Sequence, residues 1–250
     1  TLGVPVVTVE RHPDTFAIDC DAAQQAIDRQ RQDSSAAPVR VVFVVHPNSP
    51  TANALTEQEL QWLRGLPDDI LVVVDEAYYE FSQTSVVSEL AQRSNWLITR
   101  TFSKAFRLAA HRVGYSIAAP EVSATFEKIR LPYNLPSFSQ AAANVALAHR
   151  HDLLATISDL LVERDRLSHS LQEFSEFRVF PSQANFVFLR GNATDTGSPI
   201  DLANLVTHLR SQGTLIRHTG GGRRITVGTP EENQRTLARL TSYLKKYVEP

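Results

Sequence analysis

Apolar residues along the first half of the chain fall into short runs separated by segments with helical spacing. The runs bounded by turn residues predict buried strands, and the spaced segments predict amphipathic helices. Asp21 is placed to cap the first helix, and a Glu three residues after Thr56 forms a capping-box pattern at the start of the second. The predicted strands are residues 6–9, 39–45, 70–74, 95–102 and 113–118, and the predicted helices are residues 21–30, 56–66 and 121–130.

The second half of the chain shows a different order of elements. A proline-containing break at residues 132–136 precedes a long stretch of helical spacing. Residues 191–198 predict a surface loop, and the glycines at 220–222 predict a turn. The predicted helices are residues 139–174, 202–211 and 231–247, and the predicted strands are residues 177–180, 185–190, 214–218 and 224–227.

Strands that alternate with helices argue for parallel βαβ units with right-handed crossovers. The fold class predicted for the chain is therefore α/β. We expect a mostly parallel sheet with flanking helices in a large domain, residues 1–138. Residues 139–250 would then form a connecting helix and a smaller C-terminal α/β domain.

Polar residues follow three of the predicted buried strands. Asn48 and Ser49 follow the strand at 39–45, residues 75–78 follow the next, and Ser103 and Lys104 follow the third. Ligands of parallel sheets bind at the carboxyl ends of the strands. We expect these three strand ends to meet in one site.

Lys104 lies where an apolar strand gives way to a short helical turn. Partial withdrawal of an amine from water favours its neutral form, and a neutral amine can attack a carbonyl. Most lysines, however, are solvated surface charges, so the neighbours of Lys104 must decide.

Asp75 ends a run of aliphatic residues, where a bare carboxylate is costly and needs a cationic partner. A purely structural role, pairing with a core arginine or capping the next helix, is the alternative. Tyr78 lies three residues further on, within reach of the same ligand. Its alternative, shared with Tyr79, is an ordinary core aromatic residue.

Lys104, Asp75 and Tyr78 together form a coherent set for pyridoxal phosphate. A lysine can form a Schiff base with the cofactor's aldehyde, and an aspartate can hold a proton on the pyridine nitrogen. Ser103 and Arg112 are placed to bind a phosphate by hydroxyl and guanidinium. For Arg112 the alternative is a surface ion pair.

The composition of the chain limits the classes of molecule that it is expected to bind. The formal net charge of −2 gives no electrostatic sign of binding to nucleic acid or to an anionic membrane. No apolar run approaches the length of about 20 residues that a membrane span needs. A single cysteine, Cys20, excludes an internal disulfide and fits a reducing compartment. These features favour small-molecule substrates, copies of the same chain as partners and a cytoplasmic location.

Four motifs follow one another along the chain: Asp-Glu-Ala-Tyr at 75–78, Ser-Lys-Ala-Phe at 103–106, Arg-Val-Gly-Tyr at 112–115 and Arg-Ile-Thr-Val-Gly-Thr at 224–229. In order and spacing they resemble the fold type I aminotransferases that use pyridoxal phosphate. Within that class the chain is most similar to the histidinol-phosphate aminotransferases, over essentially its whole length.

The resemblance implies a role for each matching residue. Lys104 would carry the cofactor and act as general base, Asp75 would pair with the pyridinium and Tyr78 with the phenolic oxygen. Ser103 and Arg112 would bind the cofactor phosphate, and Arg217 and Arg224 the substrate anion. The implied reaction interconverts L-histidinol phosphate plus 2-oxoglutarate and imidazole acetol phosphate plus L-glutamate, a step of histidine biosynthesis, in a homodimer.

Several positions depart from the family pattern. Ser49 stands where an asparagine usually contacts the ring oxygen, with Asn48 as the neighbouring substitute, and Arg107 stands where glycine is common. The family also carries about a hundred residues ahead of the position of Thr1, including groups that bind the cofactor. We expect an N-terminal segment to be missing here, and an incomplete sheet with a weakened site without it.

Three other functions fit the same residues. A decarboxylase of the threonine-phosphate type would use the same lysine, aspartate and tyrosine, and an aromatic amino acid aminotransferase would need a similar pocket. A catalytically silent sensing domain of the same fold is the non-enzymatic alternative. The retained lysine argues against the last.

Overall fold

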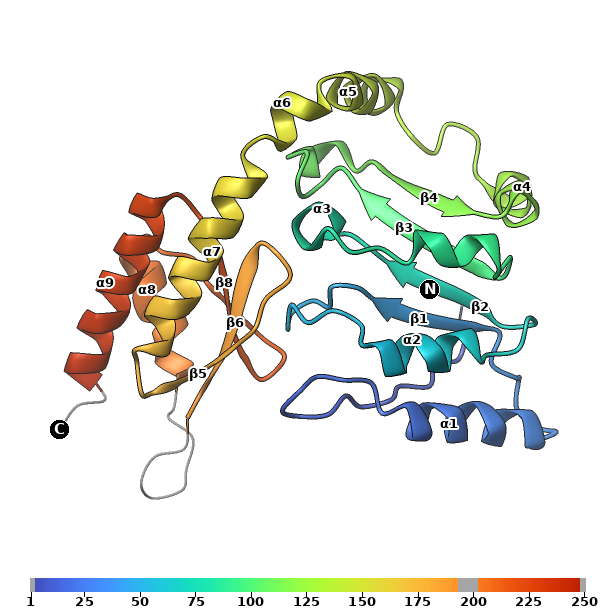
Figure 1. The fold of residues 1–250 in the computed structure, drawn as a ribbon, viewed down its shortest axis with the longest axis horizontal. Helices are drawn as coiled ribbons and strands as arrows, with labels where there is room; N and C mark the ends of the chain where they lie inside the picture. The colour runs from blue at the N-terminus through green and yellow to red at the C-terminus, as the bar shows by residue number, and fades with distance from the viewer. Residues whose placement is uncertain (1–2, 193–201, 248–250) are drawn as a thin grey trace.

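The computed structural model describes residues 3–192 and 202–247, which form two four-stranded sheets with helices around them (Figure 1). The first sheet has the order β1-β2-β3-β4 and the second β5-β6-β8-β7. In the first half of the chain the elements are α1 (Cys20–Gln32), β1 (Val41–Val45), α2 (Glu57–Arg64), β2 (Leu71–Asp75), α3 (Tyr79–Ser82), η1 (Val87–Ala91), β3 (Trp96–Thr101), η2 (Ala109–His111), β4 (Gly114–Ala118) and α4 (Pro120–Ile129). The second half contains α5 (Ser137–Ala148), α6 (Arg150–Leu154), α7 (Ile157–Gln172), β5 (Phe177–Phe180), β6 (Phe186–Gly191), α8 (Ala203–Ser211), β7 (Arg217–Thr219), β8 (Gly222–Thr226) and α9 (Pro230–Tyr247).

The first sheet is mixed. Strands β1, β2 and β3 are parallel, as the apolar runs predict, and Asp75 at the end of β2 is in register with Val45 of β1 and Thr99 of β3. Strand β4 is antiparallel to β3, so the sheet is mostly parallel, as expected, with one antiparallel strand at its edge. The physical reason is the short connection after β3, which holds a single 3-10 turn, η2, instead of a crossover helix.

Two apolar cores form on different sheets. The first packs α1, α2 and the strands of the first sheet around Trp96, and the second packs α7, α8 and α9 against β6 and β8. A smaller cluster joins the two parts through Tyr78 of the first and Phe186 of the second. This junction lies at the carboxyl ends of β2 and β3, where the polar strand ends were expected to meet.

Helix starts depend on local capping. The capping box at α2 is confirmed, because Thr56 accepts a hydrogen bond from the Glu59 amide and Glu59 accepts one from the Thr56 amide. The cap of α1 is Asp19 rather than the predicted Asp21, since the Asp19 side chain accepts from the amide of Ala22. Asp21 lies in the first helical turn instead, where a negative charge favours the helix dipole.

Two other predictions are wrong. Residues 6–9 do not form a strand: they follow Pro5, and the exposed Val6 has no ladder neighbour in the described part of the chain. The single long helix at 139–174 is three helices, α5, α6 and α7, with breaks after Ala148 and Leu154. Apolar residues recur at helical spacing across these breaks, so periodicity alone does not locate them.

The remaining expected elements of the second half are present with shifted ends. Strand β7 begins at Arg217 rather than at 214, and β8 begins at Gly222. Gly220 and Gly221 form the turn between them with φ of 58° and 69°, which glycine adopts without a steric cost. The predicted loop at 191–198 lies almost entirely outside the described residues.

Candidate functional site

Lys104 lies in a turn immediately after β3. Its position is set locally by the Ser103 amide, which donates to the Thr101 hydroxyl at 3.0 Å, and by the Arg107 amide, which donates to the Lys104 carbonyl at 3.0 Å. The Lys104 side chain is half-buried, and its Nζ lies 5.3 Å from the centre of the Tyr78 ring. The amine therefore faces an aromatic surface, which attracts its charged form and limits its access to water.

Asp75 lies across from this turn, at the end of β2. Its carboxylate accepts a hydrogen bond from the Ala77 amide at 3.0 Å and another from the Thr99 side chain, and it is attracted by the positive charge of Lys104. Burial raises the pKa of Asp75, and these three contacts oppose that rise without cancelling it. A cation able to share the charge of the carboxylate, such as a protonated pyridine nitrogen, would favour its ionised form.

Tyr78 connects the lysine to the second sheet. Its ring is buried and meets the ring of Phe186 edge-on, with 5.2 Å between centroids. The guanidinium of Arg224 covers Phe186, with its carbon 4.5 Å from the ring centre. A continuous row of side chains thus leads from Lys104 to an arginine of β8.

Arg224 also returns to the first sheet. Its Nη1 donates to the hydroxyl of Ser49 at 3.3 Å, across 175 positions of sequence. Its Nε is buried and has no hydrogen-bond partner within the described residues. An unpartnered donor at this place is suited to an anion that bridges the two sheets. Arg217 lies opposite Arg224 in the β7–β8 register, and its side chain is exposed.

The remaining predicted residues are less closely joined to this row. Ser103 is half-buried beside Lys104. Arg112 is exposed and donates to the carbonyl of Ala109 at 3.0 Å, within its own loop.

The buried amide of Asn48 donates to the hydroxyl of Thr51 at 2.6 Å, so it supports the turn that carries Ser49. Arg107 donates to the hydroxyl of Thr156 at 2.9 Å.

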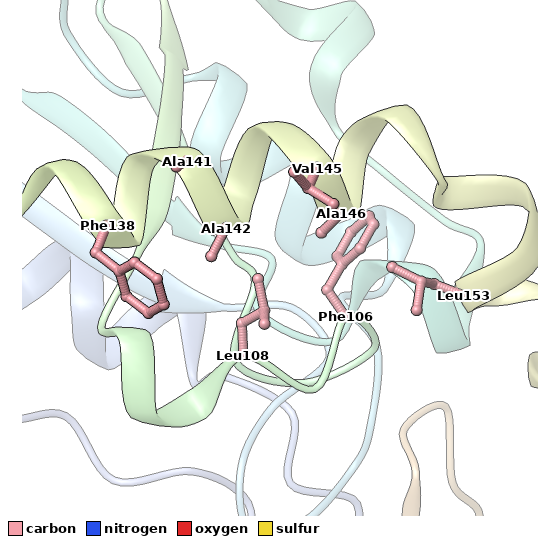
Figure 2. A pocket seen from close by; sticks show the side chains of 8 residues that line it. All are labelled: Phe106, Leu108, Phe138, Ala141, Ala142, Val145, Ala146 and Leu153. Carbon is pink, nitrogen blue, oxygen red and sulfur yellow. The ribbon is translucent and has the colours of Figure 1, made fainter.

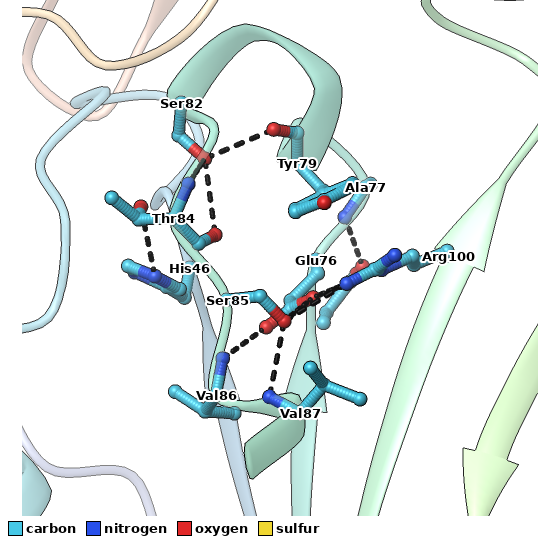
Figure 3. Close-up of polar contacts among 11 residues, drawn as sticks. His46, Glu76, Ala77, Tyr79, Ser82, Thr84, Ser85, Val86, Val87 and Arg100 are labelled. Carbon is cyan, nitrogen blue, oxygen red and sulfur yellow. Dashed lines mark hydrogen bonds and ion pairs between the residues drawn. The ribbon is translucent and has the colours of Figure 1, made fainter.

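Sequence reasoning overlooked the pairing of Glu76 with Arg100 behind the site. Glu76 is fully buried, and Arg100 of β3 donates to its Oε2 from Nε at 3.0 Å and from Nη2 at 2.8 Å (Figure 3). The signal was available: a second acid directly after Asp75, in an apolar turn, also needs a cation. Phe186 was overlooked as well, because nothing in its own strand distinguishes it from a core residue.

A separate cavity of about 400 Å³ lies between α5 and the turn after β3 (Figure 2). The side chains around it, all from the described part of the chain, are apolar. Binding sites for polar metabolites carry a few convergent polar groups, so this cavity is not the candidate site. Its lining is Phe106, Leu108, Phe138, Ala141, Ala142, Val145, Ala146 and Leu153.

The aspartate, the tyrosine and the lysine thus follow the ends of β2 and β3, two parallel strands of a mixed sheet. The chain belongs to the aminotransferase class I and II family, whose model matches residues 1–240.

Among individual relatives, the chain is 56% identical over 248 residues to the histidinol-phosphate aminotransferase of Trichodesmium erythraeum (strain IMS101), covering 96% of this chain and 64% of that protein. It is 58% identical over 247 residues to histidinol-phosphate aminotransferase 2 of Nostoc sp. (strain PCC 7120), covering 98% of this chain and 63% of that protein. The chain therefore spans a little under two thirds of the length of these two relatives.

Solved structures show the same fold. The histidinol-phosphate aminotransferase from Clostridium acetobutylicum superposes with a TM-score of 0.81 at 23% identity, over 98% of this chain and 72% of that one. The enzyme from Sinorhizobium meliloti, solved in complex with pyridoxal-5'-phosphate, gives 0.79 at 24% identity, over 97% of this chain and 65% of that one. At these identities the likeness is one of fold.

Proposed function

We propose that the protein containing this chain is a pyridoxal-phosphate-dependent transaminase of histidine biosynthesis. It would interconvert L-histidinol phosphate plus 2-oxoglutarate and imidazole acetol phosphate plus L-glutamate. The observation that carries the proposal is the row formed by Lys104, Tyr78, Phe186 and Arg224, with Asp75 beside the lysine. This row joins an amine, a nearby carboxylate and a guanidinium, the groups that the proposed cofactor and substrate anion need.

The residues present fit the cofactor. Lys104 offers the amine that the aldehyde requires, Asp75 the carboxylate for the ring nitrogen and Tyr78 a hydroxyl for the ring oxygen. Ser103 lies beside Lys104 for the phosphate, and Arg112 would have to leave the Ala109 carbonyl to join it. The raised pKa of Asp75 supports this fit, because a carboxylate strained by burial gains most from a cationic ring nitrogen.

When bound, pyridoxal phosphate supplies an electron sink for the substrate's Cα. Lys104 would act as the general base that takes the proton from the substrate's Cα. Asp75 would face the ring nitrogen, and its carboxylate would favour the protonated form of that nitrogen. Arg224 holds the substrate's phosphate or carboxylate, since a guanidinium binds either anion through two parallel hydrogen bonds.

Lysine usage makes this proposal unusually easy to test. The chain has four lysines, and the other three, Lys128, Lys245 and Lys246, lie in α4 and α9. We would reduce the purified protein with borohydride in the presence of pyridoxal phosphate and map the added mass. A pyridoxyl group on Lys104 that is lost in Lys104→Ala and kept in Lys128→Ala is the expected result. An adduct spread over the exposed lysines contradicts the proposal.

Once borohydride trapping has located the cofactor on Lys104, the choice of substrate is tested with untreated protein. L-Histidinol phosphate and L-glutamate should each convert the bound cofactor to its amino form, which changes its visible absorption. Release of CO2 from threonine phosphate without any 2-oxoglutarate would instead identify a decarboxylase. Conversion by aromatic amino acids in preference to L-histidinol phosphate would identify an aromatic aminotransferase.

Assembly, location and domain division are also proposals. We propose a cytoplasmic homodimer, with a large domain at 1–138 and a smaller one at 139–250. Support for the dimer comes from α4, α5 and the segment between them, where large apolar side chains are exposed, and sedimentation of the purified protein tests it. These exposed apolar side chains include Ile129, Leu131, Tyr133, Phe138 and Val145.

None of the helices in the described ranges is long and apolar enough to cross a membrane.

A further inference from the structure

The buried carboxylate of Glu76 accepts hydrogen bonds from two segments of the chain, β3 and the residues just before η1. Besides the two from Arg100, it accepts one from the Ser85 hydroxyl at 2.9 Å and one from the Val86 amide at 2.7 Å (Figure 3). Arg100 donates to Ser85 as well, at 2.8 Å, and its guanidinium lies 3.5 Å from the centre of the Tyr79 ring. Glu76 and Arg100 are thus each held by several contacts besides the one between them.

These contacts favour the charged form of Arg100. Burial by itself lowers the pKa of Arg100, but hydrogen bonds to Glu76 and Tyr115 raise that pKa above its ordinary value. With Glu76 fully enclosed and the Arg100 side chain 11% exposed, loss of one partner leaves the other as an uncompensated buried charge. The local backbone must then move to admit water.

The movement would reach the candidate site through the strand geometry. Successive side chains of a strand point to opposite faces. Thr99 hydrogen-bonds Asp75 on the face of the site, and the next residue, Arg100, binds Glu76 on the other face. The Glu76 amide also donates to the Thr99 carbonyl at 2.8 Å. Two consecutive residues of β2 and its following turn are therefore paired with two consecutive residues of β3.

The same pair controls the turn after β2. Glu76 lies between Asp75 and Tyr78, and Tyr79, which stacks on Arg100, follows Tyr78 directly. Lys104 comes four residues after Arg100 at the end of the adjoining strand. Asp75, Tyr78 and Lys104 thus all sit within a few residues of one ion pair.

We propose that Glu76 and Arg100 are positioning residues that hold Asp75 and Tyr78 in register with the Lys104 turn and so determine how tightly the cofactor is bound. The inference rests on the proposed function for the identity of that cofactor. It assigns a task to two residues that face away from the site.

The test compares Glu76→Gln with Glu89→Gln. The control removes the charge of another carboxylate that binds an arginine through two nitrogens, Arg64 Nε at 2.9 Å and Nη2 at 2.8 Å. For each variant we would measure the dissociation constant of pyridoxal phosphate, the visible circular dichroism of the bound cofactor and the thermal midpoint. In cofactor-free protein, we would follow the NMR chemical shift of the Asp75 carboxyl carbon as a function of pH.

Glu76→Gln should weaken cofactor binding about tenfold to a hundredfold, the range found when residues that orient binding groups are replaced. It should also change the circular dichroism and move the titration midpoint of Asp75, whose facing charge is Lys104. Glu89→Gln should lower only the thermal midpoint. A folded Glu76→Gln with parental binding, dichroism and Asp75 titration overturns the proposal.

Two further arms keep the result interpretable. If Glu76→Gln does not fold, Arg100→Lys retains the charge but loses the two-nitrogen contact, and the same changes are expected of it. Parental behaviour in a folded Arg100→Lys would then overturn the proposal. Absence of a borohydride adduct on Lys104 in the parent protein rejects the proposed function instead, while the Asp75 titration still decides whether the pair positions that carboxyl.

Discussion

The Nζ of Lys104 lies 5.3 Å from the centre of the Tyr78 ring, although the two residues leave different strands. Their meeting follows from the parallel register of β2 and β3, which brings both carboxyl ends to the same edge of the sheet. Phe186 then joins Tyr78 from the second sheet, so that one tyrosine contacts both halves of the candidate site.

Asp75→Asn should stabilise the cofactor-free protein at neutral pH. The pKa of Asp75 is higher in the folded protein than in the unfolded chain. At pH values between these two pKa values the folded state therefore binds more protons, and the free energy of unfolding falls as the pH rises through this range. Asparagine removes this cost, yet it should weaken binding of pyridoxal phosphate. Chemical unfolding across the pH range and a cofactor titration measure the two effects.

Asp33→Asn is the control of opposite sign. Hydrogen bonds from Ser35 lower the pKa of Asp33, so its contribution is present at neutral pH and is lost as pH falls through the lowered pKa. Its asparagine variant should be slightly less stable at neutral pH and unchanged in cofactor affinity. Equal signs for the two variants would contradict the electrostatic account of Asp75.

Arg224→Met should raise the KM for the anionic substrates by about tenfold to a hundredfold, since hydrogen bonds between charged groups are worth roughly 1.5–3 kcal/mol. Arg217→Met should have a smaller effect, because Arg217 is exposed while Arg224 is half-buried against Phe186. Steady-state kinetics with both amino donors measures this, with borohydride trapping on Lys104 as the check that the cofactor is still bound. A larger effect at Arg217 would reverse the assignment.

Ser49→Ala should act in the same direction as Arg224→Met but more weakly. The serine hydroxyl accepts one hydrogen bond from Arg224 at 3.3 Å, and a single exposed contact contributes roughly 0.5–1.5 kcal/mol. We expect a rise in KM of less than about tenfold with unchanged cofactor affinity. A loss of cofactor instead would mean that Ser49 itself contacts the ring.

Arg107→Gly should be more stable than Arg107→Ala by about 1 kcal/mol. Arg107 has φ of 60°, a conformation that costs residues with a Cβ roughly 1–2 kcal/mol and glycine very little. Both variants lose the contact with Thr156, so their difference isolates the backbone term. Urea denaturation gives the comparison, and an alanine variant equal to or more stable than the glycine variant would contradict it.

Glu59→Ala should lower the free energy of unfolding by about 2–4 kcal/mol, because two amides lose their acceptor. Glu59 is 1% exposed and accepts from the amides of Ile18 at 2.7 Å and Thr56 at 2.6 Å, which ties the segment before α1 to the start of α2. Gln58→Ala, at an exposed position of the same helix, should change stability by less than about 0.5 kcal/mol. Thermal or urea unfolding distinguishes the two.

Local signals in the sequence were sufficient for much of the fold. The apolar runs at β1, β2 and β3 predicted buried parallel strands, and the spacing of Thr56 and Glu59 predicted a capping box that the structure contains. The polar residues after the buried strands predicted that the ends of these strands, including Asp75 and Lys104, would meet at one edge of the sheet. Each of these depends on short-range pattern or on a general rule of parallel sheets.

Other features depend on what lies next to a segment in space. The valines at 6–9 have strand propensity but pair with no strand of the described residues, and the helical spacing of residues 139–174 continues across two breaks. The direction of β4 follows from a short connection whose path the apolar pattern does not describe.

The sequence by itself therefore determined the chemistry of the strand ends, because residue type and position after an apolar run are local properties. Only the tertiary structure decided which of those residues share a space. The contacts of Arg224 with Ser49 and Phe186, and of Arg100 with Glu76, join residues whose separation in sequence carries no signal. They arise from the packing of one sheet against another and from the register of neighbouring strands, which are set by the whole fold.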